Sequence, residues 1–387
     1  MKRRKVVYIS GTRADYGLMR TVLSKVQASK SLSLSIIATG MHLSREFGYT
    51  VKEIENDGFE IHAKIPSLRA EDTGAGMLRS FARFLTRVVD TLEQLQPDVI
   101  LLLGDRWEML AGAMAGSYMN LLVAHIHGGE LSGSIDEPNR HAITRFSHLH
   151  FVATRQHARL LCEIGEEPSR IHIIGSPGLD DIATHNYAPK EVVGKKYHLV
   201  VNRPHALLVQ HPVVTERHQA GEQMTRTIDA IVRLGISTTA IYPNADAGGR
   251  VMIRVMEKYA KRHHFIRPYK NITRDEYLGL MAVSSVIVGN SSSGIIEAAS
   301  MGVPAVNIGT RQQGRIHPGN VIDVDYDTAQ IAQAIRKGLA TGFRTKIRGL
   351  KNPYGNGRSG VRIAKILSKI RPTPILLQKR LTFRMVQ

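Results

Sequence analysis

The chain has a single cysteine, Cys162, among its 387 residues. One thiol cannot form a disulfide within the chain or a zinc site built on cysteines, so disulfide-stapled and cysteine-zinc proteins are excluded. The sequence also lacks any run of about 18 apolar residues, and the apolar stretch near its start is too short for a signal peptide. We therefore expect a cytoplasmic protein without stable membrane insertion.

Aromatic and acidic residues are also scarce. Phe, Trp and Tyr make up 6% of the chain, and 33 acidic residues face 52 Lys and Arg, for a net charge of +19. Nucleic-acid-binding proteins gather basic residues in patches with interleaved aromatics. Here the basic residues are scattered, so we expect no nucleic-acid partner. We interpret the charge as a solvated basic surface, which would favour a phosphate-rich substrate without identifying one.

Short aliphatic or β-branched runs alternate with helix-like segments, and they do so in two sets. Runs that are apolar on both faces are typical of strands buried in parallel sheets, with crossover helices between them. The pattern therefore predicts an α/β chain with two doubly wound parallel sheets. The first set comprises residues 5–10, 34–39, 98–103, 121–126, 149–154 and 171–176, and the second comprises residues 206–211, 238–243, 284–289 and 304–309.

The segment between the two sets, Asp181–His205, contains two prolines and few apolar runs, so we interpret it as an inter-domain connection. We expect an N-terminal domain over residues 1–185, a C-terminal domain over 200–366 and a basic tail over 367–387. Two such sheets leave a cleft between them, and ligands of doubly wound sheets bind beyond the carboxyl ends of the strands. For the end of the tail, Arg371–Gln387, we expect disorder or an amphipathic extension that touches a partner subunit or membrane surface.

Polar residues follow the strands predicted in the first half. Gly11 and Arg13 come after the first strand, where a tight turn and a helix start offer N–H groups and positive charge to an anion. An ordinary turn in which Arg13 pairs with Asp15 fits the same residues. Asp105 follows the most apolar strand, and it either caps the next helix or faces the cleft with a raised pKa.

The stretch Val123–Arg145 contains three histidines, three carboxylates and two arginines. Three interpretations compete: a metal site that uses His125, His127 and Glu130, an acid/base site, and a polar helix start without chemistry. The metal interpretation is not favoured, because no further set of ligands converges on these residues. We expect no metal, and we interpret His125 as a structural residue at a strand end.

The second half carries the densest anion-binding pattern, Asn290–Gly294, between a predicted strand and an Ile/Ala-rich helix. Its three serines exceed what a helix N-cap needs, and hydroxyl and N–H groups at a helix start bind phosphate. Glu297 would repel phosphate, so we expect it to accept hydrogen bonds from ribose hydroxyls. Further polar residues that follow the predicted strands are His211, Asn244, Asp246, Arg250, Arg311 and Arg315.

Taken together, these motifs resemble the UDP-N-acetylglucosamine 2-epimerase family, and most closely its hydrolysing branch, which serves sialic-acid-type sugar synthesis. The resemblance covers the chain from about residue 5 to residue 366. It implies the GT-B fold, in which two Rossmann-like domains face each other across a cleft and a C-terminal helix packs back on the first domain. The matching segments are Gly11–Gly17, Gly104–Glu108, His125–Thr144, Gln210–Pro212, Pro243–Gly248 and Gly289–Arg315.

The resemblance implies a reaction on a UDP-sugar that uses no metal and no cofactor. A base removes the proton at C2 while UDP leaves C1, which gives a glycal-like intermediate. Water then adds at C1, and a proton returns to C2 on the opposite face, so the products are the free 2-epimerised sugar and UDP. Non-hydrolysing relatives carry a glutamate where this chain has His127, and this favours the hydrolysing reaction.

Carried over residue by residue, the resemblance also implies site residues. Asp105, Glu130 and Asp136 match acid/base carboxylates, and crowded carboxylates raise one another's pKa, which keeps one of them protonated at neutral pH. His211 matches a histidine at the pyrophosphate leaving group. The implied substrate contacts are Arg13, Ala14, Arg106, Asn244, Arg250, Ser291, Ser292, Gly294, Glu297 and Arg311.

Two other function classes stay open at this point. A GT-B glycosyltransferase with a UDP-sugar donor needs the same nucleotide loop but not the carboxylates, and a non-enzymatic basic protein needs neither. Within the epimerase hypothesis the substrate is UDP-N-acetylglucosamine or a UDP-2,4-diacetamido-2,4,6-trideoxyglucose relative, as in legionaminic acid synthesis. We expect a homo-oligomer, either a dimer or a tetramer.

Overall fold

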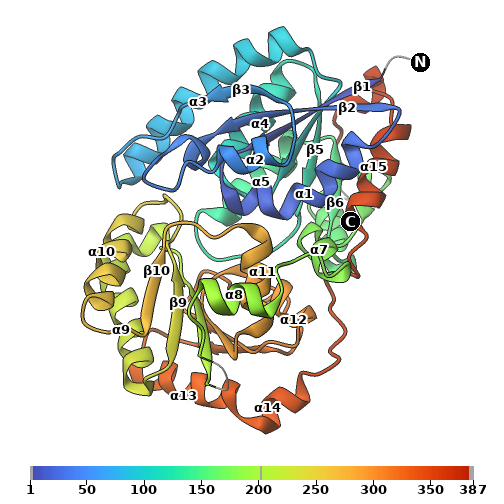
Figure 1. Ribbon diagram of the computed structural model, residues 1–387. Helices are drawn as coiled ribbons and strands as arrows, with labels where there is room; N and C mark the ends of the chain where they lie inside the picture. The colour runs from blue at the N-terminus through green and yellow to red at the C-terminus, as the bar shows by residue number, and fades with distance from the viewer. Residues whose placement is uncertain (1–2, 201–202, 383–387) are drawn as a thin grey trace, which may run out of the picture.

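The computed structural model describes residues 3–200 and 203–382, which form two parallel β-sheets with helices packed on both faces (Figure 1). The first sheet has the strand order β3-β2-β1-β4-β5-β6-β7, and the second has the order β10-β9-β8-β11-β12-β13. The predicted α/β, doubly wound fold is therefore confirmed. The strands are β1 (Arg4–Ser10), β2 (Leu32–Thr39), β3 (Ile61–Ile65), β4 (Val99–Leu103), β5 (Leu122–Ile126), β6 (Leu149–Val152), β7 (Ile171–Ile173), β8 (His205–Val209), β9 (Ser237–Ile241), β10 (Ile266–Tyr269), β11 (Val286–Gly289), β12 (Ala305–Ile308) and β13 (Val321–Val324).

Most connections between successive strands contain helices, as crossovers between parallel strands usually do, and four further helices follow β13 within the described residues. Those of the first half are α1 (Arg13–Gln27), α2 (Val51–Asn56), α3 (Gly74–Leu95), α4 (Trp107–Tyr118), α5 (Asp136–Phe146), α6 (Arg155–Glu163) and α7 (Asp180–Ala183). Those that follow are α8 (Lys190–Lys196), α9 (Ala220–Leu234), α10 (Gly249–Ala260), α11 (Arg274–Val283), α12 (Glu297–Ser300), α13 (Thr328–Leu339), α14 (Thr341–Lys346), α15 (Ser359–Lys369) and α16 (Pro374–Leu377).

The strands that the sequence pattern did not predict are β3, β10 and β13, and all three lie at sheet edges. An edge strand buries less of its surface, so its sequence lacks the continuous apolar run of a central strand. Most residues of β10 and β13 are only partly buried. Strand β10 also contains Pro268, which an edge strand tolerates because one side of its backbone needs no partner.

The strand order reverses between β1 and β4 in the first sheet, and between β8 and β11 in the second. At such a point the two following loops diverge to opposite faces of the sheet and leave a crevice beyond the carboxyl ends of the strands. Arg13 and Asp105 follow β1 and β4, whereas His211 and Ser291 follow β8 and β11. The topology therefore gathers the polar motifs at one crevice in each half.

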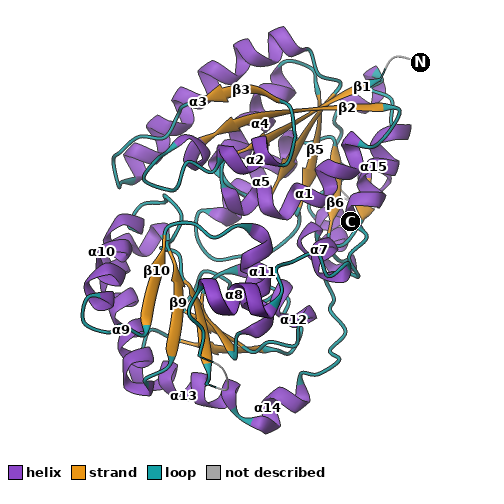
Figure 2. Cartoon of the chain, viewed as in Figure 1, coloured by secondary structure: helices purple, strands orange, loops and turns teal. Residues whose placement is uncertain are grey.

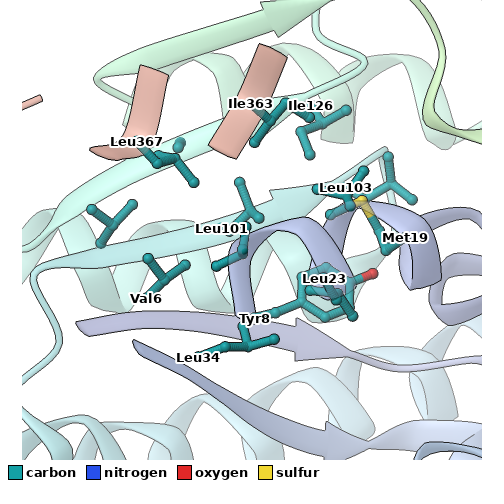
Figure 3. Close-up of a cluster of buried hydrophobic side chains, with 14 of the residues drawn as sticks. Val6, Tyr8, Met19, Leu23, Leu34, Leu101, Leu103, Ile126, Ile363 and Leu367 are labelled. Atoms are coloured by element: carbon teal, nitrogen blue, oxygen red, sulfur yellow. The ribbon is translucent and has the colours of Figure 1, made fainter. Parts of the chain in front are cut away.

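Helix α15 returns to the first half and packs beside α1, as the resemblance implied (Figure 1). Its apolar face completes the core over the first sheet, where Ile363 lies beside Ile126 and Leu367 lies farther along the same cluster (Figure 3). All three side chains are fully buried. The two halves of the molecule are thus joined at two places, through the segment before α8 and through the segment before α15.

The chain beyond α15 also docks on the first half. Arg170 donates hydrogen bonds to the carbonyl oxygens of Ile375, Leu376 and Gln378 at 2.7–3.2 Å. The expectation of a disordered tail is therefore wrong for residues 371–382, and residues 383–387 lie outside the described part of the chain. No helix in the described ranges is long and apolar enough to cross a membrane.

Candidate functional site

The main cleft is lined by residues of both halves, from loops at the carboxyl ends of both sheets. Figure 2 shows loops of the two halves facing each other between the two sheets. The first half contributes the loops after β1, β4 and β5, and the second contributes the loops after β8, β9, β11 and β12. The cleft therefore joins the polar motifs of both switch points. The predicted site residues that line it are Arg13, Ala14, Asp105, Arg106, Glu130, Asp136, His211, Asn244, Ser291, Ser292, Glu297 and Arg311.

The loop after β1 presents Arg13 to the cleft. Helix α1 begins with a capping box, in which Thr12 and Asp15 accept each other's backbone N–H groups. Asp15 also accepts a hydrogen bond from the hydroxyl of Tyr8. With Asp15 used in this way, the pairing of Arg13 with Asp15 is wrong, and Arg13 instead donates to the carbonyl oxygen of Ile272 across the cleft.

Two carboxylates of the first half lie together near the centre of the cleft. Asp105 accepts a hydrogen bond from Arg140, and helix α4 has no side-chain cap, so Asp105 is not a capping residue. Asp136 accepts from Nη2 of Arg311, a residue of the second half, at 2.9 Å. Burial, and then the negative charge of Asp105, raise the pKa of Asp136 to about 6 although Arg311 opposes the change. Asp136 can therefore exchange a proton near neutral pH.

Glu130 has the opposite environment. Its Oε2 atom lies 2.5 Å from Nη1 of Arg315 and 3.6 Å from Nη1 of Arg140, and its Oε1 atom lies 3.2 Å from Nδ1 of His127. Burial alone would raise the pKa of Glu130, but the interactions with His127, and then with Arg315 and Arg140, outweigh burial and hold the pKa well below its usual value. Glu130 therefore stays ionised at neutral pH.

His211 enters the cleft from the loop after β8. The side chain of Asn290 accepts the backbone N–H of His211 and donates to its carbonyl oxygen, which fixes the loop. Burial, and then nearby arginines such as Arg311, lower the pKa of His211, so the ring is neutral. Its Nδ1 atom lies 3.2 Å from the backbone N–H of Asn244 and accepts from it. The neutral ring therefore carries its proton on Nε2.

The serine loop after β11 lines the second half of the cleft. Ser291 accepts from the backbone N–H of Ser293 and lies 2.9 Å from its hydroxyl oxygen, and both Ser291 and Ser292 line the cleft. The helix expected after this loop is only a 3₁₀ turn followed by the four-residue α12. A helix dipole is consequently weak here, and positive charge at this end of the cleft comes from arginines.

Two predicted substrate contacts lie apart from the main cleft lining. Gly294 is buried behind the serine loop, where its carbonyl oxygen accepts from Asn320 at 2.9 Å. Arg250 lines a separate shallow groove and forms a bidentate pair with Glu46 of the first half, at 2.7 and 2.8 Å. The guanidinium of Arg250 also lies 5.7 Å from the centre of the Phe47 ring.

Three cleft residues have no role predicted from the sequence. Asn271 and Arg274 follow β10, and Arg274 donates to Glu297 at 3.2 Å and to the carbonyl oxygen of Gly178 at 2.8 Å. Recognition of β10 as a strand would have pointed to these residues, but an edge strand gives little signal. Arg315 contacts Glu130, and the sequence pattern indicated it, together with Arg311, only as a polar residue in the loop after a predicted strand.

Within the histidine-rich stretch, His125 lies in β5 and has a structural role. His125 bonds through Nε2 to the carbonyl oxygen of Gly104 at 2.7 Å, and through Nδ1 to the hydroxyl of Thr144 at 3.2 Å. This agrees with its interpretation as a structural residue. Over residues 3–200 and 203–382, no group of three His, Cys, Asp or Glu side chains is arranged to hold a metal ion.

Relatives of known name match nearly the whole chain. A family model described as UDP-N-acetylglucosamine 2-epimerase matches residues 24–368. The chain is 40% identical over 367 residues to the UDP-N,N'-diacetylbacillosamine 2-epimerase (hydrolyzing) of Legionella pneumophila, which covers 95% of this chain and 96% of that protein. It is 36% identical over 341 residues to the UDP-N-acetylglucosamine 2-epimerase of Neisseria meningitidis serogroup B, covering 88% of each chain.

The fold has a close match among solved structures. The crystal structure of UDP-GlcNAc 2-epimerase from Neisseria meningitidis bound to UDP-GlcNAc superposes with a TM-score of 0.81, covering 95% of this chain and all of that one at 19% identity. This likeness shows the shared GT-B-like fold. Together with the match of the family model over most of the sequence, it shows that the chain belongs to the UDP-N-acetylglucosamine 2-epimerase family.

Proposed function

We propose that this chain is a hydrolysing UDP-sugar 2-epimerase, which converts a UDP-sugar and water into the free 2-epimerised sugar and UDP. One observation carries the proposal: buried and half-buried carboxylates of the first half share a cleft with the serine loop of the second half. Transfer of a sugar to an acceptor by a glycosyltransferase leaves the C2 proton in place. Carboxylates with different proton affinities beside a nucleotide loop fit chemistry at C2.

The nucleotide end of the cleft combines hydroxyl groups with guanidinium groups. Ser291 and Ser292 offer hydroxyl and backbone donors to the diphosphate, and Arg13 and Arg311 supply positive charge from opposite sides. Glu297 accepts from the ribose hydroxyls. These residues bind UDP in both the substrate and the product, so their loss weakens UDP binding first.

His211 stabilises the leaving group. Because its Nδ1 atom accepts from the backbone of Asn244, the Nε2–H group is the donor that can face the diphosphate oxygen at C1. A fixed neutral donor stabilises charge that develops as the C1–O bond breaks. A neutral ring also avoids adding a further buried cation beside Arg13, Arg106 and Arg311.

The carboxylates transfer protons at C2. In the first step a carboxylate removes the C2 proton, the electron pair of that C–H bond forms the C1–C2 double bond, and UDP leaves with the C1–O electrons. In the second step water adds its oxygen to C1, and a proton is delivered to the opposite face of C2. Asp136, with a pKa of about 6, is suited to proton exchange, and Glu130 and Asp105 complete the acid/base set.

The substrate is drawn from two candidates. The relatives named above act by their names on UDP-N,N'-diacetylbacillosamine, which is the 2,4-diacetamido-2,4,6-trideoxyglucose compound, and on UDP-N-acetylglucosamine. We propose both for assay, with the first favoured by the higher identity of its relative. A cytoplasmic location and a homo-oligomer belong to the same proposal, and light scattering on the purified chain measures the oligomeric state.

An NMR assay in heavy water tests the reaction. The purified chain is incubated with each UDP-sugar in D₂O, and UDP and the sugar are followed over time. We expect release of UDP together with one deuterium at C2 of a free manno-configured sugar. Release of UDP with the C2 proton retained would support a glycosyltransferase or simple hydrolase instead, and no release from either substrate contradicts the proposal.

Matched variants separate binding from proton transfer. Glu130→Gln removes the anionic carboxylate, so we expect turnover to fall by at least about 100-fold while UDP affinity measured by calorimetry is retained. Ser292→Ala removes a donor to the diphosphate, so we expect weaker UDP binding. A near-normal rate for Glu130→Gln would show that the acid/base assignment is wrong.

A further inference from the structure

The C-terminal tail lies on the first half of the molecule, away from the serine loop that is proposed to bind UDP. Its short helix α16 places Leu376 and Leu377 against the core of the first sheet. The backbone is held by the Arg170 side chain, and the backbone N–H of Thr382 donates to the carbonyl oxygen of Gly165 at 2.9 Å. The tail is therefore docked on the first half, and its contacts fix the position of Lys379.

The ammonium group of Lys379 lies at the carboxyl end of helix α5. It donates to the carbonyl oxygens of Thr144 and Ser147 at 2.6 and 2.7 Å, and it lies 2.8 Å from Oε2 of Glu166. Carbonyl groups in the last turn of a helix have no partner within the helix, and a cation there interacts favourably with the helix dipole. Lys379 thus caps α5 from a segment more than 230 residues later in the sequence.

Helix α5 connects this contact to the cleft. Asp136, Arg140 and Thr144 are spaced four residues apart, so they share one face of the helix. At the near end Asp136 pairs with Arg311, and one turn later Arg140 pairs with Asp105. At the far end the hydroxyl of Thr144 bonds to His125, the residue that holds the loop before Asp105.

We propose that Lys379 is a positioning residue of the proposed epimerase: by holding the carboxyl end of α5, it sets the placement of Asp136 and Arg140 in the cleft. The inference rests on the proposed function where it concerns the rate of turnover, but the effect on the structure of α5 can be measured without turnover. Glu166 is buried and accepts hydrogen bonds from Arg145 and His150, so its carboxylate is held in place. It therefore gives the Lys379 ammonium a fixed counter-charge. The contact is therefore more defined than a solvated surface pair.

Kinetics of a matched set of variants test the role. Lys379→Met keeps most of the length of the side chain but removes its donors, whereas Arg371→Met removes an exposed charge from the same tail. We expect Lys379→Met to lower kcat by about tenfold to a hundredfold, the range seen when groups that orient a catalytic residue are lost. We expect UDP affinity to stay within about twofold, because the serine loop is on the other half. Arg371→Met should match the wild type, and Lys379→Arg should recover part of the lost rate.

Amide hydrogen exchange gives a readout that is independent of turnover. In Lys379→Met we expect faster exchange in the last turn of α5, with unchanged protection in α9 of the second half. If the wild-type chain releases no UDP, the proposed function fails, whereas the exchange measurement still tests the contact.

Three outcomes overturn the inference: an unchanged kcat in Lys379→Met, an equal loss of kcat and UDP affinity, or a rate loss that only follows the loss of folded protein. Lys379→Leu, which also lacks a donor, replaces the Met variant if that variant does not fold. An unchanged kcat for this replacement would also overturn the proposal.

Discussion

Glu130 and Asp136 show how neighbouring groups set the pKa of a carboxyl group. Glu130 is surrounded by positive charge from both halves, whereas Asp136 shares its site with Asp105. The sequence predicted a carboxylate cluster in the cleft and a raised pKa for one member. It could not predict which member, because Arg315 approaches Glu130 from a loop that lies 185 residues away in the sequence.

Replacement of Asp136 by Asn tests its raised pKa through stability. The pKa of Asp136 is about 6 in the folded chain, against an ordinary value of 3.8 for an aspartate, so the folded state binds this proton more tightly. Stability therefore falls as the pH rises from about 4 to about 6, and ionised Asp136 is a cost above that range. We expect Asp136→Asn to raise the free energy of unfolding by about 1–3 kcal/mol at pH 7.5, measured by urea titration.

The pH dependence supplies the control for this variant. At pH 4 the wild-type carboxyl is mostly protonated and resembles the amide, so the difference in unfolding free energy should shrink there. The same variant should lose at least about 100-fold in turnover at pH 7.5. A variant that is less stable than the wild type at pH 7.5 would show that Arg311 outweighs burial and that the pKa of Asp136 is not raised.

At the scale of elements, the carboxyl ends of the central strands were the most predictable feature of the site. The apolar sequence runs that form β1, β4, β8 and β11 are apolar on both faces of the strand. The residues that follow them could therefore be assigned to the cleft from the sequence. The segment after β10 could not, since an edge strand has no such run. For this reason Asn271 and Arg274 were missed, although both lie at the cleft.

Close packing of the loop after β1 explains why position 11 is a glycine better than the geometry of a turn does. The backbone of Gly11 does not adopt a positive φ, and a Cβ atom there would lie 2.7 Å from the carboxyl carbon of Glu108. Glu108 is fully buried and pairs with Arg106, so it has little freedom to move. We expect Gly11→Ala to destabilise the chain by about 1–3 kcal/mol, measured by urea unfolding.

Gly194 provides the matched control for this prediction. It lies inside α8, and a Cβ atom there would meet no heavy atom within 4 Å. Gly194→Ala should therefore stabilise the chain by about 0.5–1 kcal/mol, as expected for a glycine inside a helix. Equal effects of the two substitutions would mean that the contact with Glu108 relaxes without cost.

At the scale of the whole molecule, several contacts cross between the two halves. Arg250 forms its bidentate pair with Glu46, and the backbone N–H of Gly248 donates to Asp72 at 2.8 Å. Such long-range pairs depend on how the halves face each other, which no local pattern specifies. The resemblance implied a nucleotide contact for Arg250, whereas its position favours a different role, that of a latch, meaning an ion pair that holds the two halves together beside the cleft.

A double-variant cycle on Arg250 and Glu46 distinguishes these two roles. Residues of both halves line the cleft, so UDP should bind best to the closed form, and a latch adds to affinity by favouring closure. The pair is partly exposed, so its contribution should not exceed about 1 kcal/mol, or about fivefold in the Kd for UDP. We expect Arg250→Met and Glu46→Gln to weaken UDP binding equally, and the double variant to be no weaker than either, as measured by calorimetry.

A nucleotide contact makes a different pattern in the same cycle. If Arg250 bound the diphosphate directly, Arg250→Met would lose a charge-assisted bond worth more than tenfold in Kd, whereas Glu46→Gln would leave affinity unchanged or improve it by freeing the guanidinium. The pair Arg226 and Glu222 on α9 serves as the control, because it is an exposed Arg–Glu pair within one helix. Arg226→Met removes that pair without touching the cleft, so UDP affinity should not change, and any loss there would show that overall charge rather than closure sets the binding of UDP.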